Sequence, residues 1–266
     1  MGEAIVITSG KGGVGKTTTT ANLGTALALQ GKRVCLVDTD IGLRNLDVVL
    51  GLENRIIYDL VDVIEGRCKL HQAIVKDKRV DEMLYLLPAA QTADKNDVSP
   101  EQMKHLIEDL KQEFDFILID CPAGIEQGYR NAVAGADRAI VITTPEISAV
   151  RDADRIIGLL ELENIEPPKL IINRIRHHLM KNGDAMDVSE ITTHLSIDLL
   201  GVIIDNEDVI SSSNKGEPIV MDAKNRASLG YRNIARRLLG ESVPLMSIEE
   251  EKKGFFSKVK SIFSRS

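Results

Sequence analysis

The stretch Gly10-Lys11-Gly12-Gly13-Val14-Gly15-Lys16-Thr17 decides the fold. It satisfies the pattern G-x-x-x-x-G-K-[ST], a glycine-rich loop whose lysine reaches the phosphates and whose hydroxyl holds a magnesium ion. Residues 4–8 before it are apolar and predict a buried parallel strand, and residues 18–30 after it predict a helix. A strand, a glycine turn and a helix N-terminus together aim backbone N–H groups at one anion. The sequence therefore predicts a nucleotide-binding loop, whose contacting residues are Lys11, Gly12, Gly13, Val14, Gly15, Lys16, Thr17 and Thr18.

Length and composition restrict the class of protein. A chain of 266 residues can form one large α/β domain or two small ones, and a net charge of −7 argues against sequence-independent nucleic-acid binding by the whole surface. The cysteines, Cys35, Cys68 and Cys121, are odd in number and widely spaced, which predicts reduced thiols. No apolar run approaches the roughly 20 residues of a membrane-spanning helix, and Glu3 lies where a secretory signal would be apolar. We therefore expect a soluble, cytoplasmic body.

Apolar runs alternate with helical patterns, which predicts an α/β single-domain fold with a mainly parallel sheet and helices on both faces. The expected strands cover residues 32–38, 85–88, 116–120, 138–143, 169–173 and 199–204, and the expected helices 59–65, 99–113, 148–163 and 225–239. In the first helix, Leu23, Ala26, Leu27 and Leu29 are expected to face the sheet. Residues 91–99 are interpreted as a loop, and His177 and His178 as surface residues of a basic loop.

Acidic residues follow two of the predicted strands. Asp38 and Asp120 each end an apolar run, and ligands of such sheets bind beyond the carboxyl ends of the strands. This position suits a carboxylate that holds Mg²⁺ near Thr17. The alternative for Asp120 is a helix N-cap.

The string KGGVGKT at residues 11–17 resembles the deviant phosphate loop of the MinD/ParA family of ATPases. The runs DTDIGLRNLD at 38–47 and DCPAG at 120–124 resemble the family's two switch regions. The resemblance implies ATP and Mg²⁺ as cofactors, hydrolysis to ADP and phosphate, and a homodimer when ATP is bound. It implies that Lys11 reaches the partner's nucleotide, that Asp40 activates the attacking water, and that Gly124 donates its N–H to the γ-phosphate. From position alone, Lys11 is a surface lysine and Asp40 a turn aspartate.

A base pocket is expected at the ends of the later strands. Asn173 and Arg174 resemble the family's adenine-contacting segment, since an amide can accept from the exocyclic amine and donate to a ring nitrogen. Asp205 and Asn206 could complete the base and ribose pocket; without the resemblance they would be loop caps. In relatives the helix at residues 148–163 lies by the dimer interface and meets regulatory partners, although its charges equally fit a solvated face.

The C-terminal end carries a different pattern. Residues 252–266 hold five basic and no acidic residues, whereas residues 1–251 hold 28 basic against 40 acidic residues. Apolar residues recur on one helical face, which is typical of a helix lying in a membrane interface and binding anionic lipids. The alternative is a helix that docks on the protein's own core. The expected membrane-contacting residues are Phe255, Phe256, Val259, Ile262 and Phe263.

These features predict an ATPase domain over residues 1–240, a linker over 241–251 and a membrane-targeting tail over 252–266, peripheral on the inner face of the cell membrane. The string IGLRNLDVVLGLENRIIYDLVDV at 41–63 resembles the septum-site-determining branch of the family. That branch recruits a division-inhibitor protein to the membrane, and no nucleic acid is expected as a partner. The alternatives are a ParA-like DNA-partition ATPase, a flagellar-number relative, and a phosphate-loop enzyme that phosphorylates a small metabolite.

Overall fold

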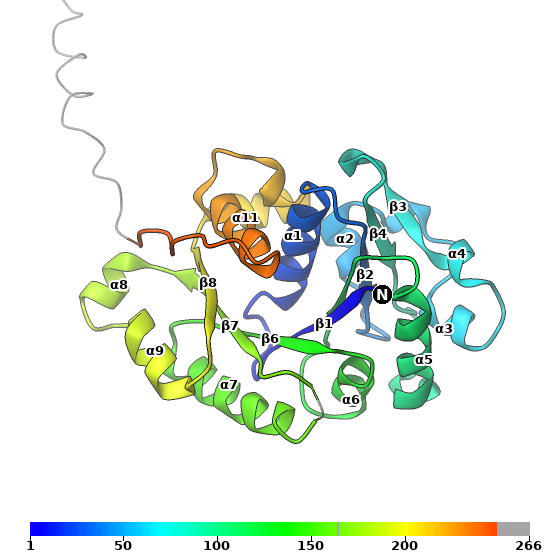
Figure 1. Cartoon of the computed structure of the whole chain (residues 1–266), viewed down its shortest axis with the longest axis horizontal. Coiled ribbons are helices and arrows are strands. Elements are labelled where there is room, and N and C mark those ends of the chain that lie inside the picture. Colours follow the sequence, from blue (N-terminus) through cyan, green and yellow to red (C-terminus); the bar gives the residue numbers. More distant parts are fainter. Residues whose placement is uncertain (164, 249–266) are drawn as a thin grey trace, which may run out of the picture.

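One sheet organises the part of the chain that this computed structural model describes, residues 1–163 and 165–248. Its strand order is β3-β4-β2-β5-β1-β6-β7-β8, and all neighbours pair parallel except β3, which runs antiparallel to β4. The phosphate loop follows β1, the strand near the centre (Figure 1). The strands are β1 (Glu3–Thr8), β2 (Val34–Asp38), β3 (Val75–Asp77), β4 (Leu84–Leu87), β5 (Phe116–Asp120), β6 (Arg138–Thr143), β7 (Lys169–Ile175) and β8 (Leu199–Ile204).

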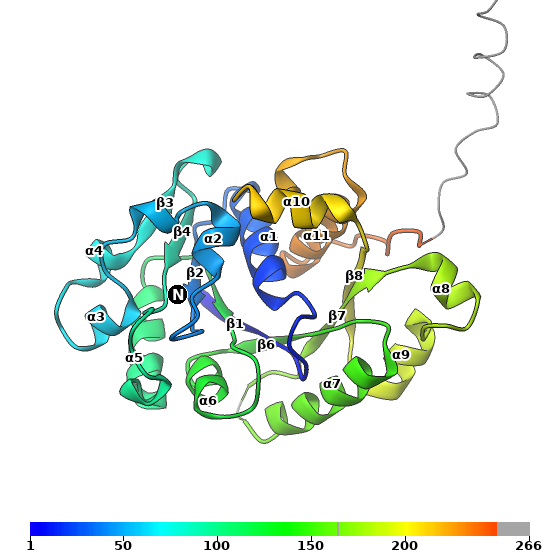
Figure 2. The same cartoon turned by 180° about the vertical axis from the view of Figure 1, so that it is seen from behind.

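Helices cover both faces of the sheet, as the alternation predicted. Along β1, Ile5 and Ile7 belong to one buried cluster while Ala4 and Val6 belong to the other, because successive side chains of a strand point to opposite faces. One face carries α1 (Lys16–Ala28), α2 (Leu46–Leu50), α10 (Glu207–Asn214) and α11 (Arg226–Leu238), which Figure 2 shows side by side. The other carries α3 (Leu60–Ile64), α4 (Leu70–Ala73), α5 (Pro100–Leu110), α6 (Gln127–Val133), α7 (Ile147–Leu160) and α9 (Val188–Leu195).

Local capping explains where several helices begin. Ser99 accepts from the Gln102 backbone while the Gln102 side chain returns to the Ser99 N–H, so the predicted capping box of α5 is confirmed. α1 begins at Lys16, two residues earlier than expected, because Gly15 takes the N-cap position with φ 101°. The helix ends at Ala28, so the prediction for Leu29 was wrong: its side chain is 41% exposed and does not face the sheet.

The sequence did not predict two short polar elements. His177 and His178 do not lie in a loop; they open α8 (His177–Lys181), a helix too short to show an apolar period. Within the expected loop at residues 91–99, Lys95–Asp97 forms a 3₁₀ turn. Residues 241–248 carry no helix or strand, yet Arg237 donates to the carbonyls of Val243 and Pro244 at 2.9 and 2.6 Å. The first part of the expected linker therefore lies on α11.

The predicted tail, residues 252–266, lies outside the described residues. Among the helices that the structure describes, none combines the length and apolar character needed to cross a membrane.

Candidate nucleotide-binding site

The phosphate loop is built from backbone conformations that favour glycine. Gly13 and Gly15 have φ values of 77° and 101°, in the left-handed region. A Cβ on Gly12 would lie 3.8 Å from the Cβ of Ala123, so the DCPAG segment that carries Gly124 lies against the loop. The second predicted switch therefore lies against the phosphate loop.

Asn173 holds the loop in place. Its side-chain Nδ2 donates to the Val14 carbonyl at 2.8 Å, and its Oδ1 accepts from the Arg174 N–H at 2.9 Å. The residue is 5% exposed, and a Cβ on Gly15 would come within 2.4 Å of its Nδ2. Besides any contact with a base, Asn173 thus ties the end of β7 to the phosphate loop.

Replacing Gly15 with alanine should destabilise the protein more than replacing Gly13. Both changes put a side chain in the left-handed region, which costs about 1–3 kcal/mol, but only the Gly15 side chain meets a buried neighbour. Urea unfolding of Gly15→Ala and Gly13→Ala measures the difference. An Asn173→Ala background should reduce the penalty of Gly15→Ala, and equal penalties with and without Asn173 would contradict the account.

The two loop lysines lie in opposite environments. Lys16 is buried, and its Nζ donates to Ser9 Oγ at 3.0 Å inside the loop. The side chain of Lys11 is 41% exposed, and its Nζ contacts Ser148 Oγ at 3.0 Å and Glu146 Oε2 at 3.5 Å, at the start of α7. Lys16 therefore belongs to the phosphate loop, whereas Lys11 lies on the surface beside α7.

Asp38 and Asp120 lie side by side, since they pair in register at the ends of β2 and β5. Both are buried, and burial raises the pKa of each carboxyl; the neighbouring Asp38 raises that of Asp120 further. Asp120 accepts from Thr20 Oγ1 at 3.2 Å, and the nearest helix after it, α6, begins only at Gln127. The helix-cap alternative for Asp120 is therefore wrong.

Asp38 also organises the first switch region. Its Oδ1 accepts from the Asp40 N–H at 2.9 Å, and its Oδ2 accepts from the N–H groups of Asn45 and Leu46, each at 3.1 Å. The loop between β2 and α2 is thereby folded around this carboxylate. In the same region Asp47 is buried and pairs with Arg44 Nε at 2.8 Å, so the Arg44 side chain already has a partner.

Asp40 is half-buried beside the loop. Burial raises the pKa of its carboxyl, while the positive charges of Lys95 and Lys16 lower it. Sequence reasoning missed Lys95, because the loop that carries it has no motif, and it missed Thr20, whose hydroxyl looks like any other in a threonine-rich helix. The structure thus brings Asp40, Lys16 and the Asp38–Asp120 pair to the end of the sheet that carries the phosphate loop.

A cavity of ≈ 500 Å³ lies next to the loop, where the base pocket was expected. Asn173, Arg174 and Asp205 line it, and Asp205 is held by Arg176 Nε at 2.6 Å. α10 forms much of one wall, which the sequence did not indicate. The other lining residues are Gly15, Thr18, Arg176, Ile203, Ile204, Asn206, Glu207, Val209, Ile210, Ser213, Asn214 and Tyr231.

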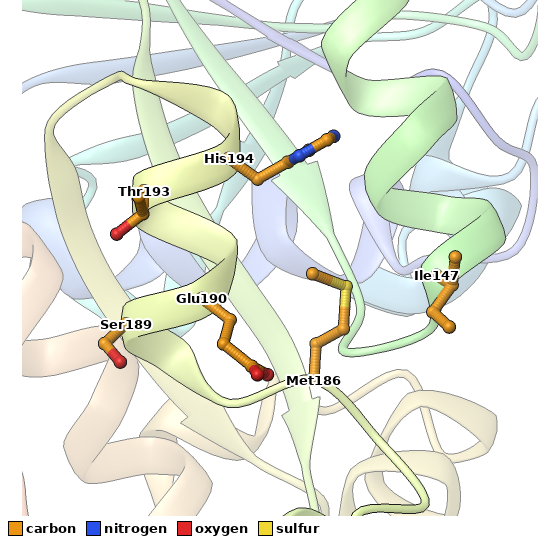
Figure 3. A pocket seen from close by; sticks show the side chains of 6 residues that line it. All are labelled: Ile147, Met186, Ser189, Glu190, Thr193 and His194. Carbon is orange, nitrogen blue, oxygen red and sulfur yellow. The ribbon is translucent and has the colours of Figure 1, made fainter.

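A second hollow of ≈ 580 Å³ lies between α7 and α9 and shares no lining residue with that cavity. Figure 3 shows His194 and Glu190 extending from α9 toward the side of Ile147, with Met186 between them. Ile147 is 67% exposed and directly follows Glu146, the carboxylate beside Lys11. This hollow is a feature of the α7 surface and not part of the nucleotide site.

Comparison with known proteins agrees with this geometry. Residues 2–166 match the AAA domain family. The septum site-determining protein MinD of Bacillus subtilis is 76% identical over 264 residues, which cover 99% of this chain and 98% of that protein. The chain belongs to the MinD family.

Solved MinD structures share the whole fold. In the MinC:MinD cell division protein complex of Aquifex aeolicus, a chain 49% identical matches with a TM-score of 0.85, covering 92% of this chain and 98% of that one. MinD of Pyrococcus horikoshii, solved in complex with Mg-ADP, is 32% identical with a TM-score of 0.80, covering 90% and 96%. The predicted α/β fold and the predicted family are therefore confirmed, and membership supports division-site selection and nucleotide binding.

Proposed function

We propose that the chain is an ATP-hydrolysing switch of division-site selection, which binds the membrane and a division inhibitor as an ATP-bound dimer and lets go after hydrolysis. The observation that carries the proposal is the convergence of Lys16, Asp38, Asp40 and Asp120 beside a phosphate loop and a base-sized cavity.

The nucleotide would lie along the path from the cavity to the loop. Asn173, Arg174 and Asp205 would contact the base and ribose, and the loop from Gly12 to Thr18 would hold the phosphates with backbone N–H groups. Gly124 would add its N–H at the γ-phosphate. The Mg-ADP complex of the Pyrococcus horikoshii relative supports the binding of a magnesium nucleotide.

The residues present also fit a magnesium ion. Asp38 and Asp120 are neighbouring carboxylates whose burial disfavours their ionised forms, and a divalent cation would offset that repulsion. We propose that Thr17, Asp38 and Asp120 hold Mg²⁺ and its water shell. The ion would supply positive charge to the β- and γ-phosphates.

Two side chains near the proposed magnesium site, Asp40 and Lys16, would carry out hydrolysis. Asp40 would accept a hydrogen bond from the attacking water and orient it toward the γ-phosphate. Lys16, already buried at the loop, would stabilise the charge that spreads over the phosphate oxygens. Burial raises the pKa of the Asp40 carboxyl, and the positive charges of Lys95 and Lys16 oppose that rise.

Lys11 would complete the site from the partner subunit. Within the described residues of the single chain, its ammonium group contacts the exposed start of α7, and ion pairs of this kind contribute about 0–1 kcal/mol. The ammonium group can therefore leave this weak contact and bind the more negative phosphates of the partner's nucleotide. ATP, with its additional phosphate, would therefore favour the dimer over ADP.

The membrane and the division inhibitor would both bind the ATP-bound dimer in preference to the single chain. One basic amphipathic tail should bind lipid weakly, whereas two tails on one dimer gain avidity of roughly 10²–10⁴. Phe255, Phe256, Val259, Ile262 and Phe263 would enter anionic lipid, at the inner face of the cell membrane. The Aquifex aeolicus MinC:MinD complex supports an inhibitor protein as the partner.

We expect ATP to recruit the intact chain to anionic liposomes and ADP to recruit it far less. A chain ending after Glu251 should stay in solution with either nucleotide, because it lacks the basic apolar face. Liposome flotation measures both. Equal flotation in ATP and ADP would contradict the switch, and flotation of the shortened chain would contradict the role of the tail.

A further inference from the structure

The guanidinium group of Arg79 connects the helix after the first switch to the helix that lines the base cavity. We propose that Arg79 is a positioning residue for ATP hydrolysis, which fixes the helix after the first switch to the helix that walls the base cavity. The inference rests on the proposed ATPase activity and names a residue that determines the placement of Asp38 and Asp40.

One partner of Arg79 is α2. The start of α2 is tied to Asp38, which accepts from the N–H groups of Asn45 and Leu46. Its last carbonyl, that of Leu50, accepts from Arg79 Nη2. The five-residue helix is thus held at one end by the proposed metal carboxylate and at the other by the guanidinium group.

The other partner is α10. Its residues Val209, Ile210 and Ser213 line the base cavity. The Gly216 carbonyl, just past the end of α10, accepts from Arg79 Nη1 at 2.6 Å. Carbonyls at helix C-termini carry partial negative charge, so one cation between two such ends stabilises both.

Arg79 itself is fixed by a buried acid. Asp77, 2% exposed, accepts from Arg79 Nε at 2.9 Å and from Nη2 at 2.7 Å. The guanidinium group has five N–H donors, so it can donate twice to the carboxylate and once to each carbonyl, whereas an ammonium group has only three donors. The position of the Arg79 guanidinium group is therefore set by Asp77, at the end of β3.

The backbone turn at Gly51, after α2, also contacts the backbone turn at Gly216, after α10. A Cβ on Gly216 would lie 2.4 Å from Gly51 Cα, and a Cβ on Gly51 would lie 2.9 Å from the Gly216 carbonyl oxygen. Both glycines have positive φ values, 63° and 68°. Because the turns meet without side chains between them, a shift of α10 against the base is passed to α2 and from there to the first switch.

The test uses the full-length chain with Arg79→Ala and Arg79→Lys. We expect kcat to fall about tenfold in both while the KM for ATP stays within about twofold, because a small misplacement of positioned groups lowers the rate more than the affinity. The half-saturating Mg²⁺ concentration should rise, since Asp38 is displaced. Arg55→Ala is the matched control: Arg55 is an exposed arginine that donates to the Lys76 carbonyl of β3 at 2.7 Å, and within the described part of the chain it makes no hydrogen bond or ion pair with α10.

Hydrogen exchange tests the connection without hydrolysis. In the wild type, ADP in EDTA should slow amide exchange over residues 39–50, and Arg79→Ala should lose that slowing. A wild type that binds ADP but does not hydrolyse ATP would refute the proposed function and leave this exchange test standing. Arg79 is refuted as a positioning residue if ADP still slows exchange in Arg79→Ala, or if kcat falls no further than in Arg55→Ala. Thermal unfolding shows which variants are folded. If Arg79→Ala does not fold, the same measurements are made on Arg79→Lys.

Discussion

Replacing Asp40 with alanine or asparagine is expected to lower kcat by about 100-fold or more, because a positioned base contributes roughly 10²–10⁴ to such reactions. The side chain is half-buried beside Lys16 and Lys95, and Asp38 holds its backbone N–H, so its position is set by the fold. In the proposed mechanism, its removal would take away the group that orients water and leave the phosphate loop unchanged. Affinity for ATP should therefore change little.

The measurement is phosphate release under saturating ATP, together with a fluorescent-nucleotide titration. Asp109→Ala is the control, since Asp109 is an exposed carboxylate on α5, away from the site. An Asp40→Ala chain that hydrolyses ATP at the wild-type rate would refute Asp40 as the base. A chain that no longer binds ATP would instead indicate a structural role for the first switch.

The two loop lysines should fail in different ways. Lys16→Ala should weaken ATP binding by at least about 100-fold, because it removes a buried charge from the phosphates. Lys11→Ala should leave ADP affinity within about fivefold, since its contacts in the single chain are exposed, but should abolish the ATP-bound dimer.

Nucleotide titration and sedimentation velocity separate these outcomes. The dimer is best observed in an Asp40→Ala background, where ATP persists, with Lys104→Ala on α5 as an exposed lysine control. A Lys11→Ala chain that still dimerises with ATP would show that Lys11 is only a surface residue.

The predictable parts of the fold are those that local sequence specifies. β5, β6 and β8 were predicted residue for residue, because each is an apolar run with polar or glycine-containing flanks. The phosphate loop and the acids at strand ends were also found, since parallel strands bring their carboxyl ends together. β3 escaped because three residues, two of them charged, give no period, and α10 escaped because its polar residues line a cavity instead of a core.

The contacts that organise the site depend on distant parts of the chain. Asn173 holds the Val14 carbonyl from 159 residues away, and Arg79 reaches the Gly216 carbonyl across 137 residues. The side chain of Asp38 is used twice, as a strand-end acid and as an acceptor for the switch backbone, and only the first use has a sequence signal. Such contacts are set by tertiary packing, so no local pattern announces them.

In the proposed site, the buried pair Asp38 and Asp120 would make the stability of the folded chain depend on nucleotide supply. Burial raises the pKa of both carboxyls above the ordinary value, so the empty fold is favoured at low pH and loses that stability as the pH rises through the raised values. A magnesium nucleotide that neutralises the pair would return stability by mass action, about 2.7 kcal/mol at a concentration 100 times its Kd. Empty chains would unfold, and be degraded, sooner than loaded ones. In a starved cell the amount of this protein would then decline together with the concentration of ATP.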